Sequence, residues 1–284
     1  MNALVQLVRA PAALTVVGDT VAGAAAAGKP LRGRRLLLPL SSAAFYWSGM
    51  ALNDWADREL DRVERPERPI PSGRISPNAA LGVAGGLTAA GLGLAAAGGG
   101  RDALRVAVPL AAMVWAYDTI LKPTVLGPVA MAGCRALDVL LGAGADRARD
   151  ALPAAAAVGG HTLGVTALSR GEVHGASPMT AGVALAGTAT AGLAAVGGPA
   201  RSWRHRLSAV ALSGVYTQLV GGAQLSARRD PSAATVRRAT GAGILGMVPL
   251  QAALAARRGS LLAAGAVAGV LPLARKLAKK VSPT

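Results

Sequence analysis

Hydrophobic residues in this chain gather into long runs, separated by short polar segments rich in Pro, Gly and Arg. The runs approach or exceed the roughly 20 residues that an α-helix needs to cross a bilayer. They do not alternate apolar and polar residues, as the short strands of a membrane barrel do. The pattern therefore predicts an all-α, polytopic transmembrane bundle, with spans at about 10–28, 36–60, 76–99, 103–120, 125–145, 151–170, 177–198, 205–225, 232–256 and 259–275.

Prolines and glycines mark the breaks between these runs. Pro66, Pro71 and Pro178 all fall in polar connections, where a missing N–H and a fixed φ are tolerated. The penultimate run contains Pro249 and is expected to be partly interfacial, so the sequence predicts nine or ten spans. No long linker divides the chain, and we expect one transmembrane domain over residues 1–284.

Composition favours a membrane protein over a soluble one. Hydrophobic residues make up 52% of the chain and charged residues 15%, and the mean hydropathy is +0.42. Soluble domains carry about 25% charged residues. Abundant Gly and Ala suit the close approach of helices in lipid. We therefore expect a multi-pass protein of the plasma membrane.

The net charge of +16 indicates that the partners of this protein are anionic. Most Lys and Arg lie between the apolar runs, which favours membrane lipid headgroups and an anionic substrate as partners. No nucleic-acid recognition module is visible, so no nucleic-acid partner is expected. A slight excess of Lys and Arg on the side of residues 53–76 favours a cytoplasmic position for that side. The single cysteine, Cys134, excludes an intramolecular disulfide, and packing is the simpler role for it.

An acid-rich segment at residues 53–76 holds six of the 14 acidic residues. Spacings of three and four residues would put Asn53, Asp54, Asp57 and Asp61 on one face of a helix. Surface salt bridges to nearby arginines would explain part of this pattern. They do not explain why it continues into an apolar run, where ionisable groups are costly. Crowded carboxylates repel, so the cluster indicates a bound cation, for which Mg²⁺ with substrate phosphates is the natural choice.

The residues that follow supply groups for an anion. Arg65, Arg68 and Arg74 lie in a connection stiffened by prolines. Their guanidinium groups match phosphate oxygens in shape and charge. The segment therefore joins candidate ligands for a metal ion to candidate ligands for phosphate.

The order Asn-Asp-x-x-Asp-x-x-x-Asp, followed by Arg-Pro-Ile-Pro-Ser-Gly-x-Ile-Ser, resembles the first motif of the UbiA superfamily of intramembrane prenyltransferases, and in closer detail an actinobacterial EboC-like branch. The resemblance implies a bundle of about nine transmembrane helices around a central cavity. It also implies Mg²⁺-assisted ionisation of an isoprenyl diphosphate and transfer of the prenyl group to an acceptor. In that case Asp54, Asp57 and Asp61 hold metal, and Asn53, Arg65, Arg68 and Ser72 bind substrate.

A second candidate group ends the fourth run, at Tyr117 and Lys122. An interfacial Tyr and a snorkelling Lys are common at the end of a span. The resemblance instead implies that Tyr117 is catalytic and that Lys122 stabilises the departing diphosphate. Asp118 is a weaker polar candidate.

Three ionisable residues lie inside apolar runs. Arg135 and Asp138 are three residues apart and could neutralise each other, or Arg135 could face the phosphate while Asp138 orients it. Asp19 could line the acceptor pocket or serve a structural role. His161 and Tyr216 are more simply hydrogen-bonding residues between helices.

The second acidic motif of the superfamily is reduced here. The corresponding turn contains Glu172 and His174 but no Asp-x-x-x-Asp. Three alternatives are open for this turn. Glu172 completes a smaller metal and substrate site, in which Arg170 or His174 replaces the charge of a metal ion; or the second metal ion is absent; or the turn is an ordinary polar turn. The first motif would then carry more of the metal binding.

These patterns favour an integral-membrane prenyltransferase with Mg²⁺ as cofactor, an isoprenyl diphosphate as donor and an unidentified acceptor. One alternative is a non-enzymatic lipid or isoprenoid carrier that keeps the phosphate-binding face. Another is a membrane terpene cyclase or diphosphate hydrolase. The sequence carries no signal for oligomeric state, prenyl chain length or acceptor.

Overall fold

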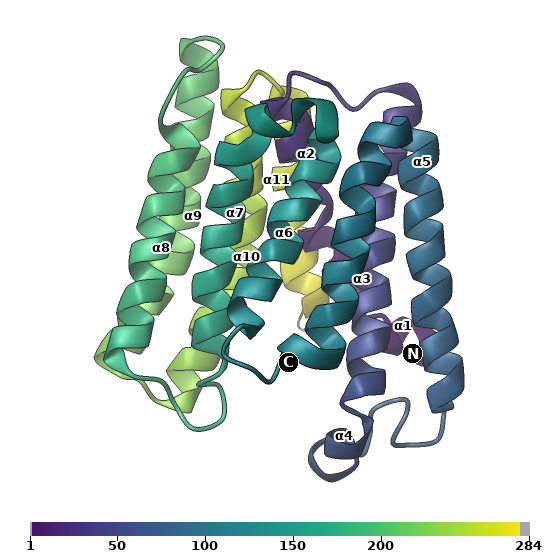
Figure 1. Ribbon diagram of the computed structural model, residues 1–284. Helices are drawn as coiled ribbons and strands as arrows, with labels where there is room; N and C mark the ends of the chain where they lie inside the picture. The colour runs from purple at the N-terminus through teal and green to yellow at the C-terminus, as the bar shows by residue number, and fades with distance from the viewer. Residues whose placement is uncertain (1, 279–284) are drawn as a thin grey trace.

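The computed structural model describes residues 2–278, which form helices running up and down in one bundle (Figure 1). No β-strand occurs in this range. The larger helices are α2 (Val17–Ala26), α3 (Leu37–Ala56), α5 (Pro77–Ala116), α6 (Gly127–Ala143), α7 (Ala148–Ser169), α8 (Pro178–Val196), α9 (Trp203–Arg229), α10 (Ala233–Arg257) and α11 (Leu261–Ala278). The shorter ones are α1 (Ala3–Leu7), η1 (Ala10–Thr15), η2 (Gly33–Leu36), α4 (Arg58–Glu64), η3 (Tyr117–Leu121) and η4 (Ala145–Arg147).

Helix α5 consists of two arms. Gly100 has φ 64° and ψ −148°, a conformation that L side chains rarely adopt, and it breaks the helix there. The arms fold back on each other against α3, since the indole Nε1 of Trp115 donates to Thr88 Oγ1 at 2.9 Å. With these two arms, every one of the ten predicted spans overlaps a helix, and the predicted fold class is confirmed.

The structure corrects the first two predicted spans. The run at 10–28 is not one helix, because η1 has Pro11 in its first turn and α2 begins only at Val17. The run at 36–60 breaks at Asp57, which separates α3 from α4.

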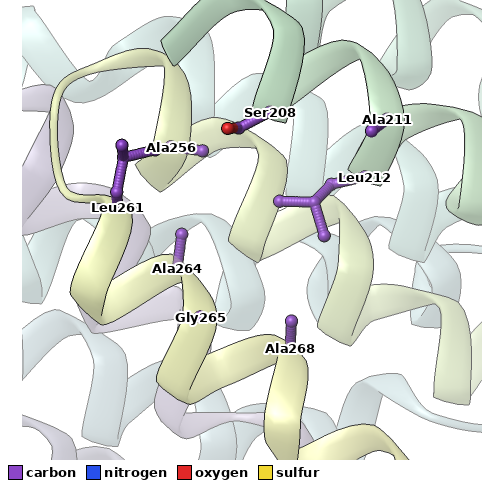
Figure 2. Close-up of a pocket in the computed structure, with 8 residues that line it drawn as sticks. All are labelled: Ser208, Ala211, Leu212, Ala256, Leu261, Ala264, Gly265 and Ala268. Carbon is purple, nitrogen blue, oxygen red and sulfur yellow. The ribbon is translucent and has the colours of Figure 1, made fainter. Parts of the chain in front are cut away.

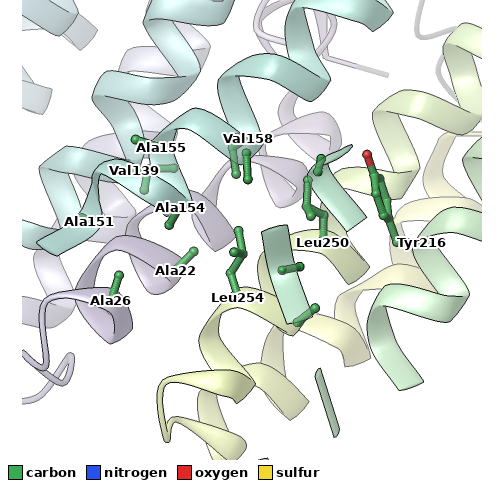
Figure 3. Packing of buried hydrophobic residues seen from close by; sticks show 14 of the residues in the cluster. Ala22, Ala26, Val139, Ala151, Ala154, Ala155, Val158, Tyr216, Leu250 and Leu254 are labelled. Atoms are coloured by element: carbon green, nitrogen blue, oxygen red, sulfur yellow. The ribbon is translucent and has the colours of Figure 1, made fainter. Parts of the chain in front are cut away.

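Small residues let the helices approach closely. A Cβ added to Gly23 would lie 1.7 Å from the Val139 carbonyl oxygen, and one added to Gly142 would lie 2.0 Å from that of Thr20. Helices α2 and α6 therefore cross with their backbones almost in contact. Beside this crossing lies a core of Ala22, Val158, Leu250, Leu254, Tyr216 and their neighbours (Figure 3).

Within the described residues, five helical segments are long and apolar enough to cross a membrane by length and composition. They are Ala3–Ala26, which combines α1, η1 and α2; Pro77–Leu121, which includes both arms of α5; Ala145–Ser169; Pro178–Val196; and Ala233–Arg257. Other helices, such as α3 and α9, are as long but carry more polar residues or lower hydropathy. The chain is a multi-pass membrane protein of helical-bundle type.

Candidate active site

The aspartates of the first motif meet two arginines at one end of the bundle. Arg68 Nη1 lies 2.6 Å from Asp61 Oδ2 and 3.4 Å from Asp54 Oδ1. Arg9 Nη2 approaches the same Asp54 oxygen at 3.0 Å. Asp54 and Asp61 are buried, with exposed fractions of 3% and 2%. Their helices converge because the chain turns at Asp57, after α3, and returns through the proline-rich connection that carries Arg68.

Asp57 and Asn53 face the end of the second arm of α5 instead. Asp57 forms an ion pair with Lys122, and Asn53 Nδ2 donates to Asp118 Oδ1 at 3.2 Å. The segment η3 is a turn of π-helix, a feature often found at functional sites, and it places Asp118 and Lys122 on this face. Tyr117 is partly buried against the apolar cluster of α3, α5 and α6. Its catalytic role stays a prediction.

Arg9 is a site residue that the sequence reasoning missed. Its backbone has φ 44°, the only positive φ among the non-glycine residues that the structure describes. Its guanidinium group reaches Met50 Sδ at 3.2 Å as well as Asp54. A left-handed conformation costs about 1 kcal/mol or more for such a residue, so the surroundings of Arg9 hold it in place. A lone basic residue beside Pro11 was the one available signal.

The remaining polar residues of the connection brace its turn. Ser72 Oγ donates to the Arg68 carbonyl oxygen at 2.7 Å. Arg74 donates to Gln6 Oε1 at 2.6 Å and to Ser72 Oγ at 2.9 Å. Ser72 and Arg74 thus hold the backbone next to Arg68 and contact none of the three motif aspartates in this structure.

Glu172 lies in the turn between α7 and α8, on the side of Arg65. Burial raises the pKa of Glu172 above its ordinary value, against the opposing effects of Thr240, Arg237 and Arg65. Arg237 also donates to the Glu172 carbonyl oxygen at 2.7 Å. The reduced second motif is therefore held by α10, and Arg65 exerts only the smallest of these charge effects on Glu172. Arg170 donates to the backbone oxygen of Thr124, beside Lys122, while His174 is exposed.

The carboxylates of this site supply only some of the ligands that a Mg²⁺ ion needs. Within residues 2–278, no three His, Cys, Asp or Glu side chains lie close enough together to hold a metal ion. Asp54 and Asp61 nevertheless share one cation, and both are buried carboxylates with oxygen ligands to offer. Mg²⁺ commonly takes one or two protein carboxylates and fills its coordination with water and substrate phosphates. The arrangement therefore fits a metal that arrives with a phosphorylated substrate.

Asp19 and Arg135 lie in a different group, deeper in the bundle. Arg135 Nη2 is 3.0 Å from Asp19 Oδ2 and donates to the Thr15 carbonyl oxygen at 3.0 Å. Gln251 Nε2 donates to Asp19 Oδ1 at 2.7 Å, and Asp138 accepts a hydrogen bond from Ser42. Arg135 thus pairs with Asp19 on another helix, and the sequence neighbour Asp138 is not its ion-pair partner. The predicted roles of Asp19 and Arg135 in substrate binding stay predictions.

Two other residues have the structural surroundings that the sequence favoured. His161 bonds to Tyr216 Oη at 2.8 Å and to the Gly243 carbonyl oxygen at 3.0 Å. Cys134 is buried in the apolar cluster of α3, α5 and α6. Packing and hydrogen bonding account for both.

Comparison with known proteins identifies similar chains. The model of the UbiA prenyltransferase family matches residues 13–279. A digeranylgeranylglyceryl phosphate synthase of Methanopyrus kandleri is 40% identical over 131 residues, which are 44% of this chain and 46% of that protein. The enzyme of the same name from Ignicoccus hospitalis is 42% identical over 97 residues, 34% of this chain and 32% of that protein. The matched regions thus span less than half of these relatives.

Solved structures share the fold at low sequence identity. A UbiA homolog from Aeropyrum pernix has a TM-score of 0.66 and 16% identity, covering 85% of this chain and 96% of that one. A homolog from Archaeoglobus fulgidus bound to DMAPP and Mg²⁺ has a TM-score of 0.61 and 16% identity, covering 84% and 98%. The EboC-like branch within the family stays a prediction.

Proposed function

Because this chain belongs to the UbiA prenyltransferase family, we propose that it is an integral-membrane prenyltransferase. Its donor is an isoprenyl diphosphate, and residues 1–284 act as one domain. The motif end of the bundle faces the cytoplasm of a plasma-membrane protein, in keeping with the slight excess of Lys and Arg predicted for that side.

The observation that carries the proposal is the pairing of carboxylates with cations at that end. Asp54 and Asp61 face Arg9 and Arg68, and Asp57 faces Lys122. A diphosphate brings negative charge to such cations, and a divalent metal brings positive charge to such carboxylates. Exchanging internal ion pairs for a metal–diphosphate pair keeps the site close to neutral, which lowers the cost of binding in a desolvated place.

Asp54, Asp57 and Asp61 are the residues that would hold Mg²⁺, and Glu172 is the candidate from the reduced second motif. When bound, Mg²⁺ supplies Lewis-acid stabilisation of the diphosphate leaving group. The structure of the Archaeoglobus fulgidus homolog bound to DMAPP and Mg²⁺ supports this choice of ligand and metal.

The cationic side chains act on the diphosphate. Arg9, Arg68 and Lys122 bind the phosphate oxygens and stabilise negative charge as the bond from the prenyl carbon to the diphosphate oxygen breaks. Arg65 links this group to Glu172 through its charge. The acceptor's nucleophilic atom then bonds to the same prenyl carbon, and its proton passes to the released diphosphate. Apolar packing of Tyr117 and its neighbours limits water, which would otherwise hydrolyse the donor.

The acceptor is the least specified part of the proposal. The relatives named digeranylgeranylglyceryl phosphate synthase suggest a phosphorylated, isoprenoid-bearing lipid as the first acceptor class to try. Their matched regions are short, so a panel of acceptors is needed.

Product analysis tests the proposal. The purified protein in lipid is given Mg²⁺, isoprenyl diphosphates of several chain lengths, and a panel of lipid extracts and geranylgeranyl glyceryl phosphate. We expect a prenylated acceptor and one diphosphate released for each transfer. A free or cyclised prenyl alcohol would instead indicate a hydrolase or cyclase. Tight donor binding without any release would indicate a carrier.

A further inference from the structure

The end of the bundle opposite the aspartates carries a cluster of arginines, here called the arginine end: Arg201, Arg206, Arg257 and Arg258. Arg206 donates to the backbone oxygens of Val196 and Gly198 at 3.3 and 2.9 Å. Arg258 donates to the Ala26 oxygen at 2.9 Å. Both therefore cap the carbonyl ends of helices, where positive charge is favourable.

Arg257 has no such partner. It is 8% exposed, its Nε is buried without a hydrogen bond, and within residues 2–278 its side chain forms no ion pair. The strongest charges acting on it come from Arg258 and Arg206, which are also positive. A desolvated cation among like charges is unfavourable unless an anion is near.

The acidic residues of this face are already paired with other cations. Asp146 pairs with Lys29, Asp150 with Arg147 and Asp102 with Arg105. No carboxylate among the described residues of this face is left to neutralise Arg257. The described chain thus offers Arg257 no counter-charge at this end, and an anion from outside the chain would supply one.

An apolar pocket of about 360 Å³ lies between α9, α10 and α11, and none of the four arginines lines it (Figure 2). Arg201 lies against Gly259, in the loop between the lining residues Ala256 and Leu261. Ala256 and Leu261 line it on either side of the loop that follows Arg257, and Leu212, Ala264 and Gly265 extend it along the helices. Its volume falls in the range of about 300–1,000 Å³ usual for small-molecule sites. Ser208 contributes the one hydroxyl group of the lining.

We propose that the arginine end and this pocket bind an anionic phospholipid. The phosphate lies against Arg257, and one acyl chain occupies the pocket. Charge complementarity favours a net-anionic headgroup, because a zwitterionic lipid brings its own cation to a place that already holds four arginines. The site is distinct from the aspartate end and does not depend on prenyl transfer.

Lipid retention measured by native mass spectrometry tests the site. The full-length protein is purified from micelles with equal amounts of phosphatidylglycerol and phosphatidylcholine. Wild type should retain phosphatidylglycerol about fivefold over phosphatidylcholine. R257Q should lose most of this preference. R149Q removes the same charge from an exposed residue of the same face and should keep it.

Two glycine variants test the pocket separately. A side chain at Gly265 or at Gly269 meets no atom within 4 Å of its Cβ, but only Gly265 lines the pocket. G265L should therefore reduce retention of phosphatidylglycerol, and G269L should not. Because neither change removes a contact, this pair keeps the test valid if R257Q fails to fold.

Several outcomes would overturn the proposal. Equal retention of the two lipids by wild type would leave only a nonspecific groove. Equal loss in R257Q and R149Q would indicate a general effect of surface charge. Unchanged retention in G265L would separate the pocket from lipid binding.

Discussion

Asp54 and Asp61 of the first motif and the aspartates deep in the bundle are buried, but they are neutralised differently. At the motif end, each of Asp54, Asp57 and Asp61 has an ion-pair partner among Arg9, Arg68 and Lys122. Deeper in the bundle, Asp19 and Asp138 lie near the single cation Arg135.

The partners explain what each group can do. Among the described residues, the side chains of Arg68 and Lys122 form hydrogen bonds only with carboxylates, so they can turn toward phosphate when a metal takes their place. Arg135 is fixed by backbone and sulfur contacts to Thr15 and Met247 as well as by Asp19. We infer that the first group can be exchanged for substrate, whereas the second holds α2, α6 and α10 together.

Removing one motif carboxylate should have the largest effect on turnover. We expect Asp54→Ala to slow diphosphate release about a thousandfold, since the metal and two arginines lose their common partner. Asp150→Ala, which removes an exposed carboxylate paired with Arg147, serves as the control. Single-turnover release of diphosphate is the measurement, and a wild-type rate in D54A would remove Asp54 from the site.

Breaking the deep pair should act on stability instead. Arg135→Met leaves two carboxylates without a cation and should lower the free energy of unfolding by about 3 kcal/mol or more. Thermal unfolding in detergent measures this loss. Adding Asp19→Asn and Asp138→Asn should recover part of it. A stable R135M variant that no longer binds donor would place Arg135 in the substrate site.

Lys122 should affect the rate more than the fold. Lys122→Met removes one cation from the leaving group, and we expect a fall in the rate of about a hundredfold. Lys122→Arg should restore part of the rate, because it returns the charge at a similar reach. Comparing the three proteins at saturating donor isolates this effect. Equal rates in all three would leave Lys122 as an interfacial anchor.

The exposed pair at the opposite end should matter least. Asp146 forms an ion pair with Lys29, which stabilises the fold while the carboxylate is ionised and is lost when acid protonates it. Since Asp146 is solvent-exposed, Asp146→Asn should cost less than about 0.5 kcal/mol at neutral pH. Unfolding midpoints of D146N and wild type should converge in acid. A larger neutral-pH loss would mean that the pair is more than a surface contact.

The helical segments were predictable because apolar runs and their Pro and Gly breaks are local signals. Gly100 divides one long run into two arms where the sequence shows three consecutive glycines. The break at Asp57 was not predicted, because the helical spacing of the aspartates continues through it. Residues 1 and 279–284, which belong to the predicted domain, lie outside the described residues.

The residues that make up the site were more predictable from the sequence than the ion pairs they form. The spacing of Asp54, Asp57 and Asp61 marked them as a group, but it suggested one common face. In the structure the turn at Asp57 sends Asp57 toward Lys122 and Asp54 toward Arg9. Such partners are 65 and 45 residues away along the chain, and no local pattern gives them.

Linked binding of metal and donor tests the central claim most directly. A slowly reacting isoprenyl thiodiphosphate is titrated into the protein by calorimetry, once with Mg²⁺ and once with a chelator. If the motif aspartates exchange their cations for metal and diphosphate, Mg²⁺ should strengthen donor binding at least about tenfold in wild type and far less in D54N. Equal affinity with and without Mg²⁺ in both proteins would contradict the account.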